Sequence, residues 1–207
     1  RAVEFIQKTR VDCLAISYGT MHGASKGKNV KLRREIPIAV KECLYHEGIF
    51  CVLVSHGSST VPQYIVQEIN ALDGRLQNTY GIAISELKAA IPCGIGKINV
   101  DTDIRLAVTR NLKELFVCRP ELRASSAVKQ VFELLESNPD KFDPRVFLTP
   151  LMDTVMYGNI PNEDVNAVCS CIEAGVREAI GTLIVEFGSV GRAPLVEAVT
   201  LEEMAQR

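Results

Sequence analysis

The stretch IFCVLVSHGSS, residues 49–59, decides the fold. It begins with an apolar run of strand length, and the polar segment 55–59 follows directly. Two further apolar runs, residues 12–17 (DCLAIS) and 95–100 (IGKINV), lie before and after it, with helical patterns in between. Strands that are apolar on both faces and alternate with helices indicate a parallel sheet covered by helices. The sequence therefore predicts the α/β class.

Helical patterns flank the three apolar runs. We expect helices over residues 2–9, 35–48, 62–72, 85–92 and 103–116. Beyond Cys118 the chain becomes polar and helical, with long helical patterns over 119–140 and 164–187. We therefore divide the chain into a sheet-containing part, residues 1–118, and a helical extension of the same domain, residues 119–207.

Polar residues with metal-binding or phosphate-binding groups follow each of the three expected strands. His22-Gly23 comes after the first, residues 56–59 (HGSS) after the second, and residues 99–102 (NVDT) after the third. In parallel α/β folds, chemistry sits at the carboxyl ends of the strands. The three segments are therefore expected to share one site.

Two of the three histidines in the chain are candidate metal ligands. His22 and His56 each end a strand and precede a glycine, whereas His46 lies in a helical pattern and is interpreted as an ordinary surface or core residue. Imidazole is a common zinc ligand, and a catalytic zinc takes three protein ligands and keeps one open position. We predict that His22 and His56 are two of these three ligands.

The loops around the histidines also suit a phosphate. Gly57, Ser58 and Ser59 precede an expected helix start at Pro62, where backbone N–H groups and hydroxyls can bind an anion, although the loop could also be an ordinary turn. The loop from Gly23 to Lys26 adds one cation.

Hydroxyl and carboxylate side chains beside the loops have a second, structural interpretation. Ser59 or Thr60 can cap the helix at 62–72. Asn99, Asp101 and Thr102 offer donors and acceptors to a hydroxylated substrate, but Asp101 or Thr102 can also cap the helix at 103–116.

The bulk properties exclude several classes of function. The net charge of −2 gives no broad basic field, so neither nucleic acid nor a membrane surface is expected as a partner. We expect no signal peptide, and no apolar stretch is long enough to span a bilayer. Its seven cysteines include no CxxC pair and indicate free thiols in a reducing cytoplasm; Cys169 and Cys171 lack partners at metal-ligand spacing.

Five segments of this chain resemble those of class II, zinc-dependent fructose-1,6-bisphosphate aldolases. They are GTMHGASKG (19–27), LVSHGSSTVP (53–62), KINVDTDIRLA (97–107), FDPR (142–145) and EFGSVGRA (186–193). The resemblance implies the C-terminal part of a (β/α)8 TIM barrel with a helical C-terminal extension. Barrel strands six, seven and eight would lie at 12–17, 50–55 and 95–100.

The resemblance also implies a role for each candidate site residue. His22 and His56 match zinc (Zn²⁺) ligands. The residues that match the loops holding the phosphate of dihydroxyacetone phosphate are Gly23, Lys26, Gly57, Ser58 and Ser59. Gly23 and Gly57 also match a site for a monovalent cation, Na⁺ or K⁺. The segment that matches the contacts to the ketose hydroxyls and to the same phosphate comprises Asn99, Asp101 and Thr102. Arg105 and Arg145 match arginines for the distal phosphate, the second reaching in from the partner subunit of a homodimer or higher homo-oligomer.

The implied activity is the reversible cleavage of fructose 1,6-bisphosphate to dihydroxyacetone phosphate and glyceraldehyde 3-phosphate in cytoplasmic glycolysis. Tagatose 1,6-bisphosphate is an alternative substrate. The chain opens at Arg1 inside a helical pattern, so we expect a fragment. The family's catalytic aspartate and first zinc-binding histidine would precede Arg1. The isolated chain is therefore expected to be inactive, and a truncated, non-catalytic product that binds phosphate or dimerises is a further alternative.

Overall fold

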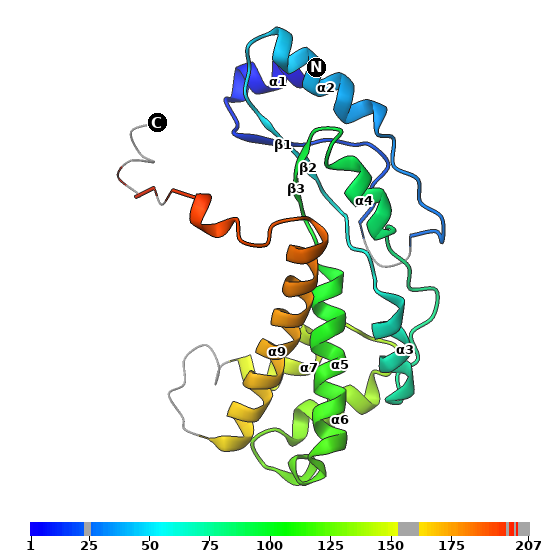
Figure 1. The fold of residues 1–207 in the computed structure, drawn as a ribbon. Coiled ribbons are helices and arrows are strands. Elements are labelled where there is room, and N and C mark those ends of the chain that lie inside the picture. The colour runs from blue at the N-terminus through cyan, green and yellow to red at the C-terminus, as the bar shows by residue number, and fades with distance from the viewer. Residues whose placement is uncertain (23–25, 153–161, 198, 201, 203–207) are drawn as a thin grey trace.

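The computed structural model describes residues 1–22, 26–152, 162–197, 199–200 and 202. Within them, three strands form one parallel sheet in the order β1-β2-β3 (Figure 1). The strands are β1 (Cys13–Ala15), β2 (Val52–Ser55) and β3 (Ile95–Ile98). The predicted parallel α/β sheet is therefore confirmed, with strands shorter than the apolar runs because the end of each run already leads into a loop.

The register of the sheet brings the ends of the three strands together. Leu14 pairs with Leu53 in the neighbouring strand, and Ser55, at the end of β2, pairs with Ile98 at the end of β3. The register shifts once, between Leu53 and Val54. All three strands therefore finish at the same edge, and the loops that follow them start side by side.

Five helices confirm the helical patterns to within two residues at each end. They are α1 (Ala2–Thr9), α2 (Glu35–His46), α3 (Gln63–Ala71), α4 (Ile84–Ala90) and α5 (Thr102–Cys118). Three of them, α1, α2 and α4, pack on the sheet. The apolar side chains of β2 and β3 pack with those of α1, α2 and α4 in one cluster that includes Leu44, Leu53, Leu87 and Ile95. Burial of this apolar surface fixes the sheet under the helices.

The chain beyond α5 is helical as expected, but the segment 119–140 is not one continuous helix. It contains a 3₁₀-helix, η1 (Pro120–Ala124), and α6 (Lys129–Ser137). Between them Ser125 is extended, and its hydroxyl donates to the Asp164 carboxylate at 2.5 Å. The break lets Leu122 and Val131 enter the same core from two directions.

Three of the remaining described helices share a core with α5. They are α7 (Pro144–Leu148), η2 (Thr149–Leu151) and α9 (Glu163–Glu186). The short η3 (Ala193–Leu195) has no buried residue. The structure confirms the helix expected at 164–187, and α9 runs alongside α5 (Figure 1). A Cβ at Gly175 of α9 would lie 2.9 Å from the Val108 Cα, so glycine allows the two helices this close approach.

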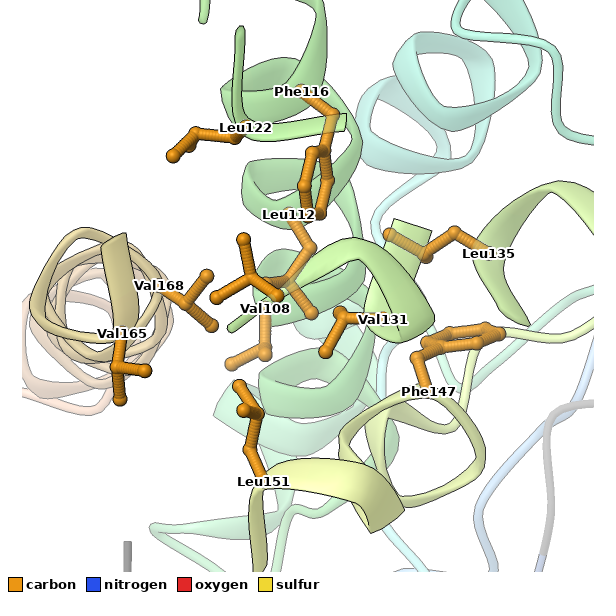
Figure 2. Packing of buried hydrophobic residues seen from close by; sticks show 11 residues of the cluster. Val108, Leu112, Phe116, Leu122, Val131, Leu135, Phe147, Leu151, Val165 and Val168 are labelled. Atoms are coloured by element: carbon orange, nitrogen blue, oxygen red, sulfur yellow. The ribbon is translucent and has the colours of Figure 1, made fainter. Parts of the chain in front are cut away.

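A second apolar core joins α5 to these later helices (Figure 2). Its buried members include Val108, Leu112, Phe116, Leu122, Val131, Leu135, Phe147, Leu151, Val165 and Val168. Because α5 begins at Thr102, shortly after β3 ends at Ile98, this helix joins the second core to the sheet. In the described part of the chain no helix is long and apolar enough to cross a bilayer.

Candidate active site

A cavity of about 280 Å³ opens where the three strands end. Its lining comprises His22, His56, Gly57, Ser59, Asn99, Val100, Asp101 and Thr102. These residues come from the loops after β1, β2 and β3, so the parallel topology brings together segments that are far apart in the sequence. Gly23, which was also predicted to bind substrate, lies outside the described residues.

His22 and His56 lie side by side in this cavity. Their ring centroids are 4.6 Å apart and the ring planes are tilted by 45°, and both residues are exposed. Nitrogen atoms of two imidazoles on one tetrahedral zinc lie about 3.3 Å apart when each Zn–N distance is about 2.05 Å. The ring separation is compatible with this spacing, so the pair fits two neighbouring positions around one ion. Among the described residues, no group of three or more histidine, cysteine, aspartate or glutamate side chains could hold a metal ion.

Gly57 makes the close approach of the two histidine loops possible. Its φ of +69° lies in the left-handed region, and a Cβ there would lie 3.0 Å from the Met21 carbonyl carbon and 3.2 Å from the His22 nitrogen. Both neighbours are backbone atoms, which a side chain cannot push aside cheaply. The glycine therefore sets the separation of His22 and His56.

Replacing Gly57 by alanine should loosen this arrangement. Gly57→Ala combines a strained φ with backbone contacts, at a cost of about 1–3 kcal/mol. Part of this strain should be relieved by moving the loops apart, and we expect zinc affinity of the full-length protein to fall by about 10-fold or more, as for a misplaced ligand. Competition against a chelator measures the affinity. Gly27→Ala is the matched control, because a Cβ at Gly27 meets nothing within 4 Å. An unchanged affinity in Gly57→Ala would contradict the assigned role.

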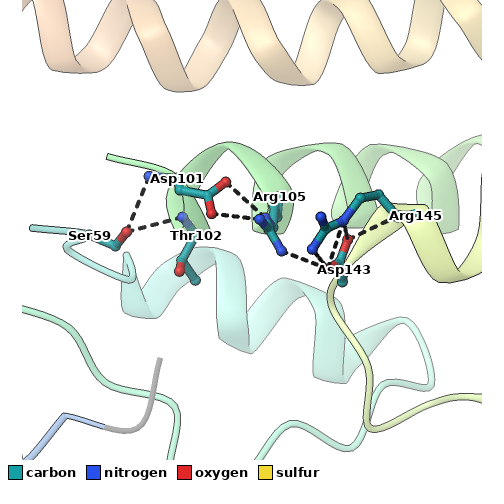
Figure 3. Close-up of polar contacts among 6 residues, drawn as sticks. All are labelled: Ser59, Asp101, Thr102, Arg105, Asp143 and Arg145. Atoms are coloured by element: carbon teal, nitrogen blue, oxygen red, sulfur yellow. Dashed lines mark hydrogen bonds and ion pairs between the residues drawn. The ribbon is translucent and has the colours of Figure 1, made fainter. Parts of the chain in front are cut away.

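Ser59 links the second loop to the start of α5 (Figure 3). Its hydroxyl oxygen accepts hydrogen bonds from the backbone N–H groups of Asp101, at 3.2 Å, and Thr102, at 3.0 Å. The expectation that Ser59 or Thr60 caps the helix at 62–72 is therefore wrong, since α3 has Pro62 at its N-cap without a side-chain hydrogen bond. Asp101 does occupy the N-cap position of α5, but its side chain makes no capping bond either.

Ser58 holds the loop after β2 through buried hydrogen bonds. Its hydroxyl hydrogen-bonds to the Ser55 hydroxyl at 2.6 Å, which in turn hydrogen-bonds to the Tyr18 hydroxyl, and all three side chains are buried. Its backbone N–H donates to the Asn99 carbonyl oxygen at 3.2 Å. Burial raises the pKa of Tyr18, although its hydrogen bond to Ser55 opposes this. In this structure the Ser58 backbone therefore joins two loops, and its hydroxyl is hydrogen-bonded to Ser55.

Asp103, in the first turn of α5, holds the loop after Ser59. Its carboxylate is 2% exposed and accepts hydrogen bonds from the Thr60 N–H at 3.0 Å, the Thr60 hydroxyl at 2.8 Å and the Val61 N–H at 2.7 Å. Burial raises the pKa of Asp103, and the hydrogen bonds partly offset that rise. Val61 has a φ of +53°, which is strained for a β-branched residue, so these bonds maintain an unfavourable backbone conformation.

Lys26 approaches the same loop from the other side. Its ammonium group donates to the Ser59 carbonyl oxygen at 3.2 Å, and the residue is 1% exposed. Burial lowers the pKa of Lys26, and the charge of Asp103 acts in the opposite direction. Lys26, which the resemblance implies to be a phosphate ligand, contacts the loop backbone in this structure.

Arg105 and Arg145 lie farther along α5 and at the start of α7 (Figure 3). Arg105 donates to both carboxylate oxygens of Asp101, at 2.8 and 2.6 Å. It also donates to Asp143 at 2.6 Å, and Arg145 binds the same Asp143 carboxylate. Asp101 therefore connects the cavity to an arginine pair outside it.

The sequence profile of the family described as fructose-bisphosphate aldolase class-II matches residues 1–189. The chain belongs to this family. Similar relatives are fructose-bisphosphate aldolase class 2 of Synechocystis, 38% identical over 206 residues, and fructose-bisphosphate aldolase 2 of Cereibacter sphaeroides, 30% identical over 207 residues. The alignments cover 100% of this chain but 46% and 47% of these relatives, so the chain spans about half their length.

Two functional contacts of this aldolase-family chain escaped the sequence analysis. The sequence predicts only that Asp103 lies in a helix. Its position directly after Asp101-Thr102, in the first turn of that helix, indicates that its carboxylate could bind a neighbouring loop. Asp143 lies in the FDPR segment, but its two arginine partners depend on the packing of α7 against α5, which the sequence does not show.

Proposed function

We propose that the full-length protein is a class II fructose-bisphosphate aldolase of cytoplasmic glycolysis. It would cleave fructose 1,6-bisphosphate reversibly to dihydroxyacetone phosphate and glyceraldehyde 3-phosphate. The paired imidazoles of His22 and His56 in the strand-end cavity carry this proposal. We further propose that β1, β2 and β3 are strands six to eight of a (β/α)8 barrel. Residues 119–207 would be an extension of the same domain.

His22 and His56 would hold the zinc ion, and the full-length protein must supply a third ligand and the proton-transferring carboxylate. Zinc, when bound, acts as a Lewis acid that polarises the ketone oxygen. The two imidazoles fix the position of the ion relative to the loops, and Asn99 and Asp101 line the cavity where the ketose hydroxyls would lie. Correct placement of the carbon skeleton is itself a large part of catalysis.

The loop after β2 and the start of α5 would bind the phosphate of dihydroxyacetone phosphate. Gly57, Ser59 and Thr102 line the cavity. The dipole of α5, a helix of 17 residues, favours an anion at its N-terminus. Gly23, Lys26 and Ser58 complete the proposed phosphate loops; Lys26 and Ser58 would act by holding the loop backbone. A monovalent cation, Na⁺ or K⁺, would bind near Gly23 and Gly57.

Arg105 and Arg145 would bind the distal phosphate. Guanidinium groups suit phosphate because they donate in a planar fork. The Arg145 side chain is 72% exposed, which leaves it accessible to the site of a partner subunit in a homodimer or higher oligomer.

Kinetics with the two epimeric sugars test the proposal. The full-length, zinc-loaded protein is expected to cleave fructose 1,6-bisphosphate with a higher kcat/KM than tagatose 1,6-bisphosphate. Coupled assays of triose phosphate release measure both. Equal or reversed preference would contradict the substrate assignment. Cleavage of neither sugar would favour the alternative of a non-catalytic, phosphate-binding or dimerising product.

A further inference from the structure

A second cavity, of about 300 Å³, lies beside the loop that follows β2. Its walls come from that loop, from α3, from the starts of α4 and α5 and from the last turns of α9. The described lining shares no residue with that of the strand-end cavity. We call this space the rear cavity. It takes no part in the aldolase chemistry proposed above.

One wall separates the rear cavity from the strand-end cavity. Ser59 lines the strand-end cavity, and the next residue, Thr60, lines the rear cavity. The start of α5 divides in the same way, because Thr102 lines the first cavity and Asp103 the second. The Ser59 hydroxyl accepts from the Thr102 N–H (Figure 3), and the Asp103 carboxylate accepts from Thr60. The two segments are therefore joined on both sides of the wall.

The rear cavity is lined mainly by apolar residues, and its charges are acidic. Val61, Ile65 and Ala179 are among its buried apolar residues. The charged side chains in the described lining are those of Asp103 and Glu186. Apolar walls favour the apolar body of a ligand, and carboxylates in a site of low polarity attract a cation and repel an anion. The lining therefore suits an organic cation.

Asp103 has room for one more hydrogen-bond donor. A carboxylate offers about four lone-pair positions. Two donors from Thr60 bind Oδ2, whereas Oδ1 accepts only from the Val61 N–H among the described residues. An ammonium group is a suitable further donor, because it combines a positive charge with several N–H groups. The other carboxylate, Glu186, already pairs at 2.9 Å with Lys88, which does not line the cavity.

We propose that the rear cavity is a second binding site, for a small amine with an apolar body, and that its occupant strengthens phosphate binding in the strand-end cavity. The volume is at the lower end of the range for small-molecule sites, about 300–1,000 Å³. The occupant packs on Val61, whose φ of +53° is unfavourable, and adds a partner to Asp103.

Both contacts stabilise the loop conformation that presents Ser59 to the strand-end cavity. A loop that is already ordered loses less entropy when a phosphate binds to it. The coupling to phosphate rests on the proposed function, whereas the binding of an amine does not.

Three probes of similar size test the class of ligand. They are benzylamine, benzyl alcohol and benzoate, titrated at pH 7 into the full-length protein and followed by ligand-observed NMR. We expect a dissociation constant of about 1 mM for benzylamine, as for a ligand of so few atoms. Benzyl alcohol should bind about threefold or more weakly, and benzoate at least about 10-fold more weakly. Equal or tighter binding of either would overturn the ligand class, and no binding of benzylamine at about 10 mM would overturn the site.

Two variants of α9 locate the bound amine. Ala179 is 7% exposed and lines the rear cavity, so the larger side chain in Ala179→Leu should weaken benzylamine by at least about 10-fold. Thr182→Phe narrows the cavity from an exposed lining position and serves where Ala179→Leu does not fold. Ala174→Leu is the matched control, because Ala174 is exposed on the same helix outside this lining. Unchanged affinity in the folded variant would place benzylamine elsewhere and overturn the proposal.

Inorganic phosphate tests the coupling. Titration calorimetry of the full-length protein should give a phosphate dissociation constant about fivefold tighter with saturating benzylamine than without it. By reciprocity, phosphate should tighten benzylamine by the same factor. An unchanged or weaker phosphate affinity would overturn the coupling. Failure of the amine-free protein to bind phosphate would contradict the proposed phosphate loop and, with it, the coupling, and the benzylamine titrations would then decide on the rear site alone.

Discussion

His56→Ala is expected to remove zinc and aldolase activity from the full-length protein together. The imidazole of His56 lies 4.6 Å from that of His22, centroid to centroid, at the mouth of the strand-end cavity. Changes to residues that only orient a metal ligand already weaken affinity by about 10- to 100-fold. Loss of a direct ligand should therefore exceed about 100-fold, and the zinc content after dialysis, measured by atomic emission, should fall close to zero.

His46→Ala is the matched control for this experiment. His46 ends α2, is exposed, has its ring edge-on to that of Tyr45, and is not among the residues that line the cavity. It should keep its zinc and its cleavage rate. Retention of stoichiometric zinc by His56→Ala would show that His56 is not a ligand, even if the activity were lost.

Asp103→Ala should cause the largest loss of stability among changes near the site. It leaves the N–H groups of Thr60 and Val61 without an acceptor beneath the loop, and each buried unpaired donor costs about 1–3 kcal/mol. We expect the free energy of unfolding to fall by about 3 kcal/mol in total, because part of the loop can relax toward solvent. Denaturant titration of the full-length protein, followed by circular dichroism, measures this change.

Thr60→Val is a milder variant that tests whether Asp103 holds the loop mainly through backbone hydrogen bonds. Thr60→Val removes only the hydroxyl that donates to Asp103 and keeps both backbone bonds, so about 1 kcal/mol should be lost. Equal losses in the two variants would show that the carboxylate does not hold the loop through its backbone bonds. A loss below about 1 kcal/mol in Asp103→Ala would contradict its role as the main acceptor.

The sequence predicted the elements whose pattern is local. The strands and α1 to α5 follow from apolar runs and helical periodicity between turn residues, and the two strand-end histidines follow from their position after apolar runs. The break at Ser125 escaped prediction because its partner, Asp164, lies in another helix. In the same way, Ser59 was assigned to the helix that follows it in the chain, whereas its hydroxyl binds the start of α5, about forty residues away.

The parallel sheet also bears on the order in which the chain folds. Residues paired between neighbouring strands, such as Leu14 with Leu53, are separated by a whole crossover connection, and closing such large loops is slow. The contacts among η1, α6 and α7 join segments close in sequence and can form early. His22 and His56 meet only when β1 and β2 pair. We therefore expect the metal-binding pair to assemble late, so that zinc is captured by an almost completely folded chain rather than guiding its first steps.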